Sequence, residues 1–280
     1  MKDFKTEDTW MVFKILGEFV DGFETLRKLG PAVSMFGGAR FPEDSREYRL
    51  ALEVAEALAR EGYAVITGGG PGIMEAANRG AAMADAPSVG LLIELPWETS
   101  ANPFVNVQVD FDYFFARKVM FMRYAQAYVV MPGGFGTLDE MFEALTLIQT
   151  AKIKNFPVIL VDSPFWAGLI SWIKDTLLVR KTISEKDLVL WKMADSAEEV
   201  VAILREARAK AGESDQSSGA GTREGLDGAN REIPSRAPRP RPAPRSSVLD
   251  PRVADAPPPA WEGPPAPEGT GRVRRKTKRR

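Results

Sequence analysis

The chain has 280 residues with a formal net charge of −1, and it contains neither cysteine nor histidine. Disulfides, Cys/His zinc sites, Ser-His-Asp and Cys-His nucleophile systems and a histidine general base are therefore excluded. Any chemistry must come from carboxylates, arginine, lysine, tyrosine, hydroxyl groups and the backbone.

The N-terminal stretch MKDFKTEDTW carries mixed charge and lacks the apolar centre of a signal peptide. The sequence has no run of about 18 apolar residues, so we expect a cytoplasmic protein without a membrane span. An amphipathic pattern over residues 8–29, ended by Gly30-Pro31, predicts a helix. Residues 1–30 are therefore assigned to an N-terminal helical arm.

Strands and helices alternate along the next part of the chain. Apolar runs predict strands over residues 32–36, 63–67, 89–95, 105–109, 127–131, 157–161 and 189–193. Helices are predicted over residues 45–60, 73–84, 113–125, 137–150, 166–178 and 196–209. Near-continuous apolar strands between helices are typical of a parallel sheet covered on both faces. We therefore predict the α/β class, with one doubly wound Rossmann-like domain over residues 31–210.

Residues 211–280 differ sharply in composition. They hold 12 of the 21 prolines, 14 Lys and Arg, 9 Asp and Glu, and a single aromatic residue, Trp261. So few apolar groups cannot offset the entropy lost on ordering, which predicts a disordered Pro/Arg-rich tail. Its basic end, RVRRKTKRR, indicates either a solvated tail or weak binding to an anionic polymer.

Three glycine-rich turns follow predicted strands. They contain Gly37 and Gly38, then Gly68, Gly69, Gly70 and Gly72, and finally Gly133, Gly134 and Gly136. Doubly wound sheets bind ligands at the carboxyl ends of their strands, so we expect the three turns on one rim around a ligand.

The second turn, GGGPG, matches no standard nucleotide motif. Ile73 occupies the position of the third glycine of G-x-G-x-x-G, and no Gly-Lys-Ser/Thr of a P-loop follows. A tight strand–helix turn that needs positive φ is one explanation. Three consecutive glycines exceed that need, which favours close approach of a ligand.

The third turn lies in PGGFGTLDE, residues 132–140. Its backbone N–H groups, a helix beginning at about Thr137 and the Thr137 hydroxyl together predict a phosphate site. Glu140 has two interpretations at this point. Thr137 and Glu140 match a capping box, in which the carboxylate caps the helix; alternatively, the carboxylate reaches a ligand beside the phosphate.

Arg117 and Lys118 fall in the first turns of the helix predicted over residues 113–125, on the same rim. A solvated surface pair is the ordinary interpretation of such residues. This helix is apolar nearly all round, however, so a cleft or an interface explains its charges better.

These residues resemble the LOG family, the cytokinin riboside 5′-monophosphate phosphoribohydrolases. The resemblance rests on the pattern PGGxGTxxE, on the Arg117-Lys118 pair and on TGGGPGIMEAANRGA over residues 67–81, and it covers about residues 13–209. It implies hydrolysis of the N-glycosidic bond of a purine nucleoside 5′-monophosphate, AMP or N6-modified AMP, to free base and ribose 5-phosphate.

The resemblance also implies roles for the residues. Arg117 and Glu140 would be catalytic, because a carboxylate near C1′ stabilises the oxocarbenium-like charge and positions or deprotonates water. The phosphate would be held by Gly133, Gly134, Gly136 and Thr137. The other rim glycines and Lys118 would belong to the ligand site, and neither a metal nor a cofactor is required. A homo-oligomer is implied, because the family associates through the helix that contains residues 141–148, which have more apolar surface than one buried face needs. Residues 17–26 resemble the longer-armed, higher-oligomer branch.

Two other interpretations are weighed against this one. Family members have often been labelled lysine decarboxylases, but pyridoxal phosphate needs a Schiff-base lysine and a partner for its pyridinium nitrogen. Lys118 is the only lysine near the predicted site. The remaining alternative is a non-catalytic carrier of the same fold that binds a nucleotide or a molybdenum-cofactor-like phosphate ligand.

Overall fold

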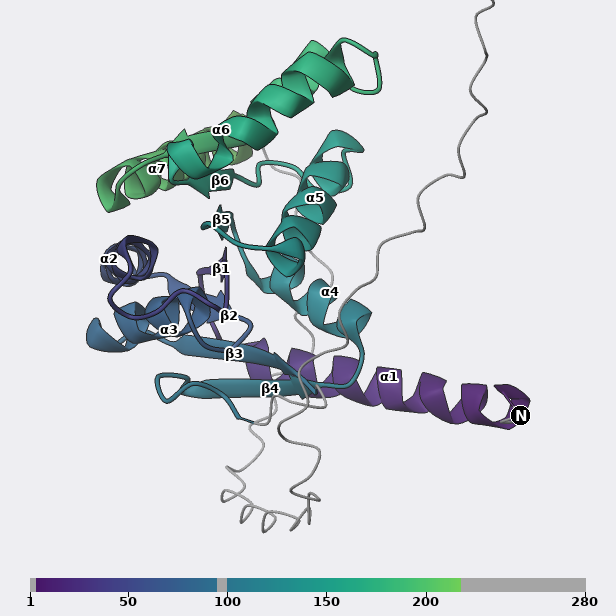
Figure 1. Ribbon diagram of the computed structural model, residues 1–280. Helices are drawn as coiled ribbons and strands as arrows, with labels where there is room; N and C mark the ends of the chain where they lie inside the picture. Colours follow the sequence, from purple (N-terminus) through teal and green to yellow (C-terminus); the bar gives the residue numbers. More distant parts are fainter. Residues whose placement is uncertain (1–3, 95–99, 218–280) are drawn as a thin grey trace, which may run out of the picture. The chain divides into compact units, whose positions relative to one another are not determined.

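The computed structural model describes residues 4–94 and 100–217. At its centre is a sheet of seven parallel strands in the order β4-β3-β2-β1-β5-β6-β7 (Figure 1). The strands are β1 (Ala32–Phe36), β2 (Ala64–Thr67), β3 (Ser88–Ile93), β4 (Val107–Phe111), β5 (Tyr128–Val130), β6 (Val158–Val161) and β7 (Trp191–Ala194). The predicted doubly wound Rossmann-like α/β fold is confirmed.

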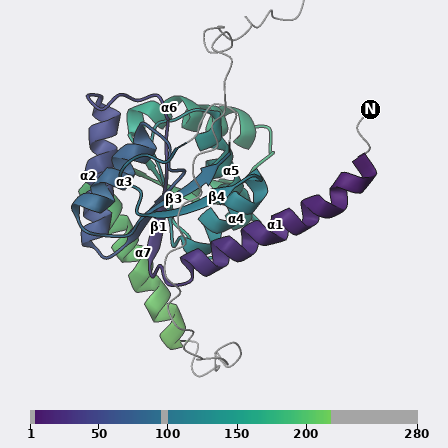
Figure 2. The same ribbon diagram turned by 90° about the horizontal axis from the view of Figure 1, so that it is seen from below.

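Helices cover both faces of the sheet (Figure 2). One face packs against α2 (Arg46–Arg60), α3 (Ile73–Met83) and α7 (Ala197–Ser217), and the other against α1 (Phe4–Leu26), α4 (Phe114–Tyr124), α5 (Phe135–Gln149) and α6 (Ser163–Trp172). Met35 and Val129 belong to the first apolar cluster, whereas Phe36 and Val130 belong to the second. Successive residues of a strand thus serve opposite faces, as the pleat requires.

The order of the strands reverses at β1. Ala32 pairs with Ala64 of β2 on one side, and Met35 pairs with Val129 of β5 on the other. The loops that follow β1 and β5 therefore diverge at this switch point and leave room for a ligand between them. They still touch at their base, where the Gly38 N–H donates to the Pro132 carbonyl over 2.9 Å.

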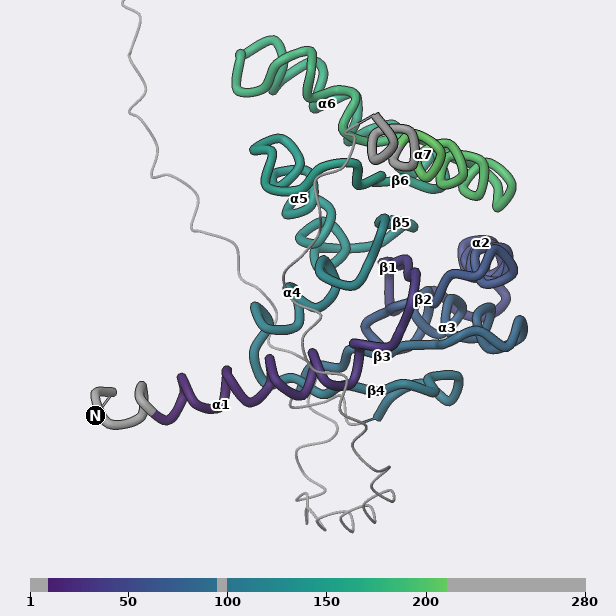
Figure 3. Tube along the Cα trace, turned by 180° about the vertical axis from the view of Figure 1, so that it is seen from behind, coloured from purple at the N-terminus to yellow at the C-terminus, as the bar shows by residue number. Residues whose placement is uncertain are grey.

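The N-terminal helix α1 lies beside β4 and α4, as Figures 1 and 3 show from opposite sides. Glu18 accepts hydrogen bonds from the backbone N–H groups of Asp112 (2.9 Å) and Tyr113 (3.4 Å), immediately before α4 begins. At the other end of α4, the Tyr124 hydroxyl donates to the Phe23 carbonyl over 3.2 Å. The arm therefore holds both ends of the helix that carries the Arg-Lys pair.

Some element boundaries differ from the predicted ones. The helix predicted over residues 166–178 consists of α6 and a π-helical segment, Ile173–Leu178, and a 3-10 helix, Glu185–Val189, precedes β7. α7 continues to Ser217, beyond the point at which the composition places the start of the tail. The remainder of the predicted tail lies outside the described residues. Among the helices that the structure describes, none is long and apolar enough to cross a membrane.

Candidate active site

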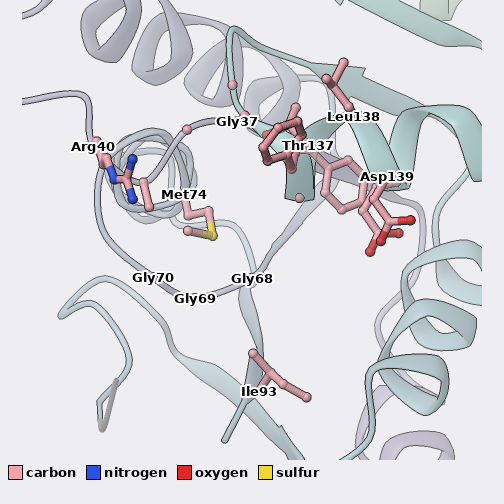
Figure 4. Close-up of a pocket in the computed structure, with 18 of the residues that line it drawn as sticks. Gly37, Arg40, Gly68, Gly69, Gly70, Met74, Ile93, Thr137, Leu138 and Asp139 are labelled. Carbon is pink, nitrogen blue, oxygen red and sulfur yellow. The ribbon is translucent and has the colours of Figure 1, made fainter. Parts of the chain in front are cut away.

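A pocket of about 780 Å³ opens at the carboxyl ends of the strands, around the switch point between β1 and β5 (Figure 4). It is lined by the loops after β1, β2 and β5 and by the start of α5, with Gly37, Gly38, Gly68, Gly69, Gly70, Gly133, Gly134 and Gly136. The structure thus brings the three predicted turns to one cavity. Its volume lies within the range of roughly 300–1,000 Å³ that is usual for small-molecule sites.

Gly72 is the one predicted glycine that does not line this pocket. It is the N-cap of α3 and has φ +68°, a left-handed conformation that favours glycine. A Cβ atom there would lie 2.6 Å from the Gly38 carbonyl oxygen. Gly72 therefore allows the loops after β1 and β2 to approach each other, and its role is structural.

The first turn of α5 forms one wall of the pocket. The helix begins at Phe135, with Gly134 as N-cap, and so starts earlier than the predicted Thr137. Its first hydrogen bond runs from the Leu138 N–H to the Gly134 carbonyl (3.0 Å), and the N–H groups before Leu138 precede the helical ladder. Thr137 is buried against Gly133, where any side chain would collide with the Thr137 hydroxyl. Such a helix start can bind an anion.

The structure excludes one of the two interpretations of Glu140, the capping box. A capping box needs Thr137 at the N-cap, but Gly134 occupies that position and no side chain caps α5. The capping interpretation is therefore wrong. The Glu140 side chain lines the pocket, is only 13% exposed, and places Oε1 3.6 Å from Lys118 Nζ. Burial, opposed by the charge of Lys118 and reinforced by that of Glu143, raises the pKa of Glu140 to about 7.

Lys118 does not line the pocket but lies behind Glu140. Its Nζ is 2.7 Å from Asp139 Oδ2 and 2.8 Å from Glu143 Oε2. Burial lowers the pKa of Lys118, but these hydrogen bonds and the charge of Glu140 outweigh that effect and raise the pKa above its usual value. Lys118 therefore stays protonated, whereas a Schiff base requires a neutral amine.

Arg117 also lines the pocket, and it packs on the second glycine turn. Its Nε donates to the Leu91 carbonyl (2.7 Å), its Nη2 donates to the Gly68 carbonyl (3.2 Å), and its guanidinium lies 5.2 Å from the centre of the Phe121 ring. A side chain at position 68 would collide with this guanidinium. Packing inside the protein thus already explains Gly68, because only glycine leaves room for Arg117.

Two buried asparagines that the sequence analysis did not single out shape the same turn. Asn102 Nδ2 donates to the carbonyls of Gly69 (3.1 Å) and Gly70 (3.0 Å) and to Asn78 Oδ1 (2.9 Å). Asn78 Oδ1 also accepts from the Thr67 hydroxyl over 2.6 Å. Asn78 falls within the motif over residues 67–81, which was a usable signal. Asn102 lies outside every motif. Its partners Gly69, Gly70 and Asn78 are distant in the sequence, so no local pattern indicated these contacts.

The pocket combines a charged part with an apolar part. The charged lining residues in the described ranges are Arg40, Arg117, Asp139 and Glu140. Its apolar side chains include Phe36, Met74, Leu92, Ile93, Phe114 and Phe121. Residues 4–94 and 100–217 hold no group of three or more His, Cys, Asp or Glu side chains placed to bind a metal ion. The arrangement suits a flat apolar group attached to an anionic one.

Comparison with protein families matches residues 74–204 to a family described as "Possible lysine decarboxylase". This range contains Arg117, Lys118 and the start of α5. The protonated, carboxylate-bound Lys118 does not fit the chemistry that this description names.

Comparison with individual proteins gives more specific likenesses. A cytokinin riboside 5′-monophosphate phosphoribohydrolase of Mycobacterium tuberculosis is 30% identical over 166 residues, which cover 56% of this chain and 87% of that protein. A pyrimidine/purine nucleotide 5′-monophosphate nucleosidase of Escherichia coli K12 is 31% identical over 144 residues, 46% of this chain and 30% of that protein. Among solved structures, the molybdenum cofactor carrier protein of Chlamydomonas reinhardtii gives a TM-score of 0.47 at 20% identity, covering 64% of this chain and 98% of that one.

Proposed function

Because the chain belongs to the LOG family, the cytokinin riboside 5′-monophosphate phosphoribohydrolases, we propose that it hydrolyses the N-glycosidic bond of a purine nucleoside 5′-monophosphate, AMP or N6-modified AMP. Water adds to C1′, the C1′–N9 bond breaks, and the products are the free base and ribose 5-phosphate. One observation carries the proposal. A buried carboxylate with a pKa of about 7, Glu140, shares a pocket with a helix start suited to phosphate.

The 5′-phosphate is assigned to the first turn of α5. Gly133, Gly134 and Gly136 keep the backbone accessible there, and Thr137 offers a hydroxyl. The positive end of the helix dipole stabilises a dianion at this position. The base is assigned to the apolar part of the pocket, where aromatic side chains can stack on a purine.

Glu140 is assigned as the general base. As the C1′–N9 bond lengthens, positive charge develops on the ribose, and an adjacent carboxylate stabilises it. Glu140 takes a proton from the attacking water, and the electron pair of the broken bond leaves with the base. The base takes up a proton from solvent and Glu140 releases its own to solvent, so that one water is consumed in each turnover. A pKa of about 7 suits this role, because the group is substantially ionised near neutral pH and still basic enough to accept a proton.

Arg117 and Lys118 are assigned different roles in this mechanism. The guanidinium of Arg117 lies on the pocket wall, fixed by the carbonyls of Gly68 and Leu91, and is assigned to orient the ribose beside Glu140. Lys118 is a positioning residue behind the pocket. Both cations lower the pKa of Glu140, and therefore keep more of it ionised.

The test is a base-release assay with AMP, N6-modified AMP and adenosine, in which free base and ribose 5-phosphate are both measured. We expect equal amounts of the two products from the monophosphates and far slower release from adenosine. Binding of AMP without release of base would favour the carrier alternative. Equal rates for AMP and adenosine would remove the assignment of the α5 start as a phosphate site.

Substitutions then test the catalytic assignments. Glu140→Gln and Arg117→Ala should each lower kcat by roughly 100-fold or more, the usual contribution of a general base or a positioned charge. Glu53→Gln, on the exposed face of α2, is the matched control and should leave kcat unchanged. Full turnover by Glu140→Gln would show that this carboxylate is not the base.

A further inference from the structure

One cation of the pocket has no part in the arrangement described so far. Of the lining residues in the described ranges, Arg40 and Arg117 carry positive charge. Arg117 is directed to the carbonyls of Gly68 and Leu91. Arg40 is exposed and forms no hydrogen bond or salt bridge with other described residues. A side chain with five N–H donors and a permanent charge thus faces the cavity without a partner among residues 4–94 and 100–217.

Arg40 follows the first glycine turn, which adjoins the proposed phosphate site. The Gly38 N–H is bonded to the Pro132 carbonyl, and a Cβ atom on Gly38 would lie 3.5 Å from the Cα of Gly133. Arg40 comes two residues later on the same loop. Figure 4 shows it across the pocket from Asp139, with its guanidinium directed toward Met74 and the open space.

The negative charges of the substrate and of the pocket carboxylates require a cation such as Arg40 for tight binding. A nucleoside monophosphate carries nearly two negative charges at neutral pH, and it must bind next to Asp139 and Glu140 on the same helix. Lys118 cannot compensate for these charges in the cavity, because three carboxylates already surround it. Backbone N–H groups supply only the partial charge of a helix end.

We propose that Arg40 binds the 5′-phosphate from the side opposite the α5 start, and that it sets the preference for nucleoside monophosphates over nucleosides. The inference deepens the proposed function and rests on it for the identity of the substrate. A planar guanidinium can hold two phosphate oxygens at once, which a lysine cannot do. Arg40 therefore acts on substrate affinity, at a distance from the bond that breaks.

The experiment compares Arg40→Gln, Arg40→Lys and Arg27→Gln with the wild-type chain. Arg27 is exposed and lies outside the pocket, so Arg27→Gln changes the net charge equally. Dissociation constants for AMP, ribose 5-phosphate and adenosine are measured by calorimetry, together with kcat and KM for AMP. For Arg40→Gln we expect Kd for both phosphates, and KM for AMP, to rise by roughly tenfold to hundredfold, the effect of losing a charge-assisted contact. Arg40→Lys should lose less affinity for the two phosphates than Arg40→Gln. The affinity for adenosine should not change in either variant.

Two results would overturn the inference: unchanged phosphate affinity in Arg40→Gln, or an equal loss of affinity for adenosine. Failure of ribose 5-phosphate to bind the wild-type protein would also overturn it, because there would then be no phosphate subsite. A different result would overturn the proposed hydrolysis without overturning the role of Arg40. If the wild-type protein binds ribose 5-phosphate through Arg40 but releases no base from any monophosphate, Arg40 is a phosphate ligand of a carrier.

Discussion

At the scale of single residues, Glu140 is a carboxylate whose burial raises its pKa at the expense of stability. Its folded-state pKa of about 7 lies above the model-peptide value of 4.5, so the folded chain retains a proton that the unfolded chain releases between these pH values. By linkage, the contribution of Glu140 to stability is full below about pH 4.5 and is lost as pH rises toward 7.

The first prediction follows from this loss of stability with rising pH. Glu140→Gln replaces a buried carboxylate with a neutral side chain that does not titrate. The wild type loses stability as pH rises and the variant does not lose this part, so the free energy of unfolding of the variant minus that of the wild type should increase from pH 5 to pH 8. Urea unfolding of both proteins at the two pH values measures it. A difference that stays constant with pH would show that Glu140 titrates normally.

The second prediction concerns Lys118, whose charge lowers the pKa of Glu140. Lys118→Met leaves Asp139 and Glu143 beside Glu140 without their shared cation, so the pKa of Glu140 should rise above about 7. The acidic limb of the pH profile of kcat/KM for AMP should therefore move to higher pH. Lys152→Met, at an exposed position, is the matched control. An unmoved limb would contradict the assignment of Glu140 as the titrating base.

At the scale of secondary-structure elements, the close packing of α2 on α3 depends on a glycine at position 80. Gly80 of α3 faces α2, and a Cβ atom there would collide with the Leu52 carbonyl and lie 2.9 Å from the Glu56 nitrogen. These are backbone atoms, which cannot move aside as a flexible side chain can.

The third prediction is that Gly80→Ala lowers the free energy of unfolding by about 1–3 kcal/mol, as overpacking does. Gly168→Ala in α6 is the matched control, because a Cβ atom there has no neighbour within 4 Å. It should be neutral or stabilise the protein by up to about 1 kcal/mol, through helix propensity alone. Equal effects of the two substitutions in thermal and urea unfolding would refute the packing argument.

At the scale of the whole molecule, exposed apolar surface favours the homo-oligomer implied by the family resemblance. The sequence predicts the contact at the apolar helix over residues 141–148, where Phe142 is 38% exposed, but most of the exposed large apolar side chains of the described residues lie on α1 and α4. On α1 they are Trp10, Met11, Val12, Phe13, Leu16, Val20 and Phe23, and on α4 they are Phe114, Phe115 and Val119. Trp10 and Phe13 are 72% and 60% exposed, more than isolated surface residues explain.

The fourth prediction is therefore a mass by light scattering at least twice the 30.8 kDa of one chain. Phe13→Glu should lower the mass, because it places a charge in the apolar surface. Val179→Glu, at a residue that is 72% exposed outside α1 and α4, should not. A monomeric mass for the wild-type chain at micromolar concentration would exclude the oligomer.

The fifth prediction concerns residues 218–280, whose composition predicts a tail without a stable core. Truncation after Ser217, the last residue of α7, should leave the melting temperature and base release nearly unchanged. It should also remove any retention of the full chain on nucleic acid at low salt, since counterion release makes such binding salt-dependent. Loss of base release in the truncated chain would show that the tail contributes to the site.

The sequence by itself determined the order and type of the elements, the parallel sheet, and the three glycine turns that meet at one rim. Periodicity and glycine placement are local signals, and right-handed crossovers leave few alternative topologies. The family, too, followed from contiguous motifs.

Only the tertiary structure decided what Glu140 is. The same sequence pattern fits a capping box and a buried pocket carboxylate. The difference depends on the start of α5 at Phe135 and on the contact of Lys118, from α4, with Glu140. Asn102 and Arg40 were inaccessible to sequence reasoning for the same reason. Their partners and surroundings come from segments distant in the chain, and burial, which sets the pKa of a carboxylate, is a property of the packed whole.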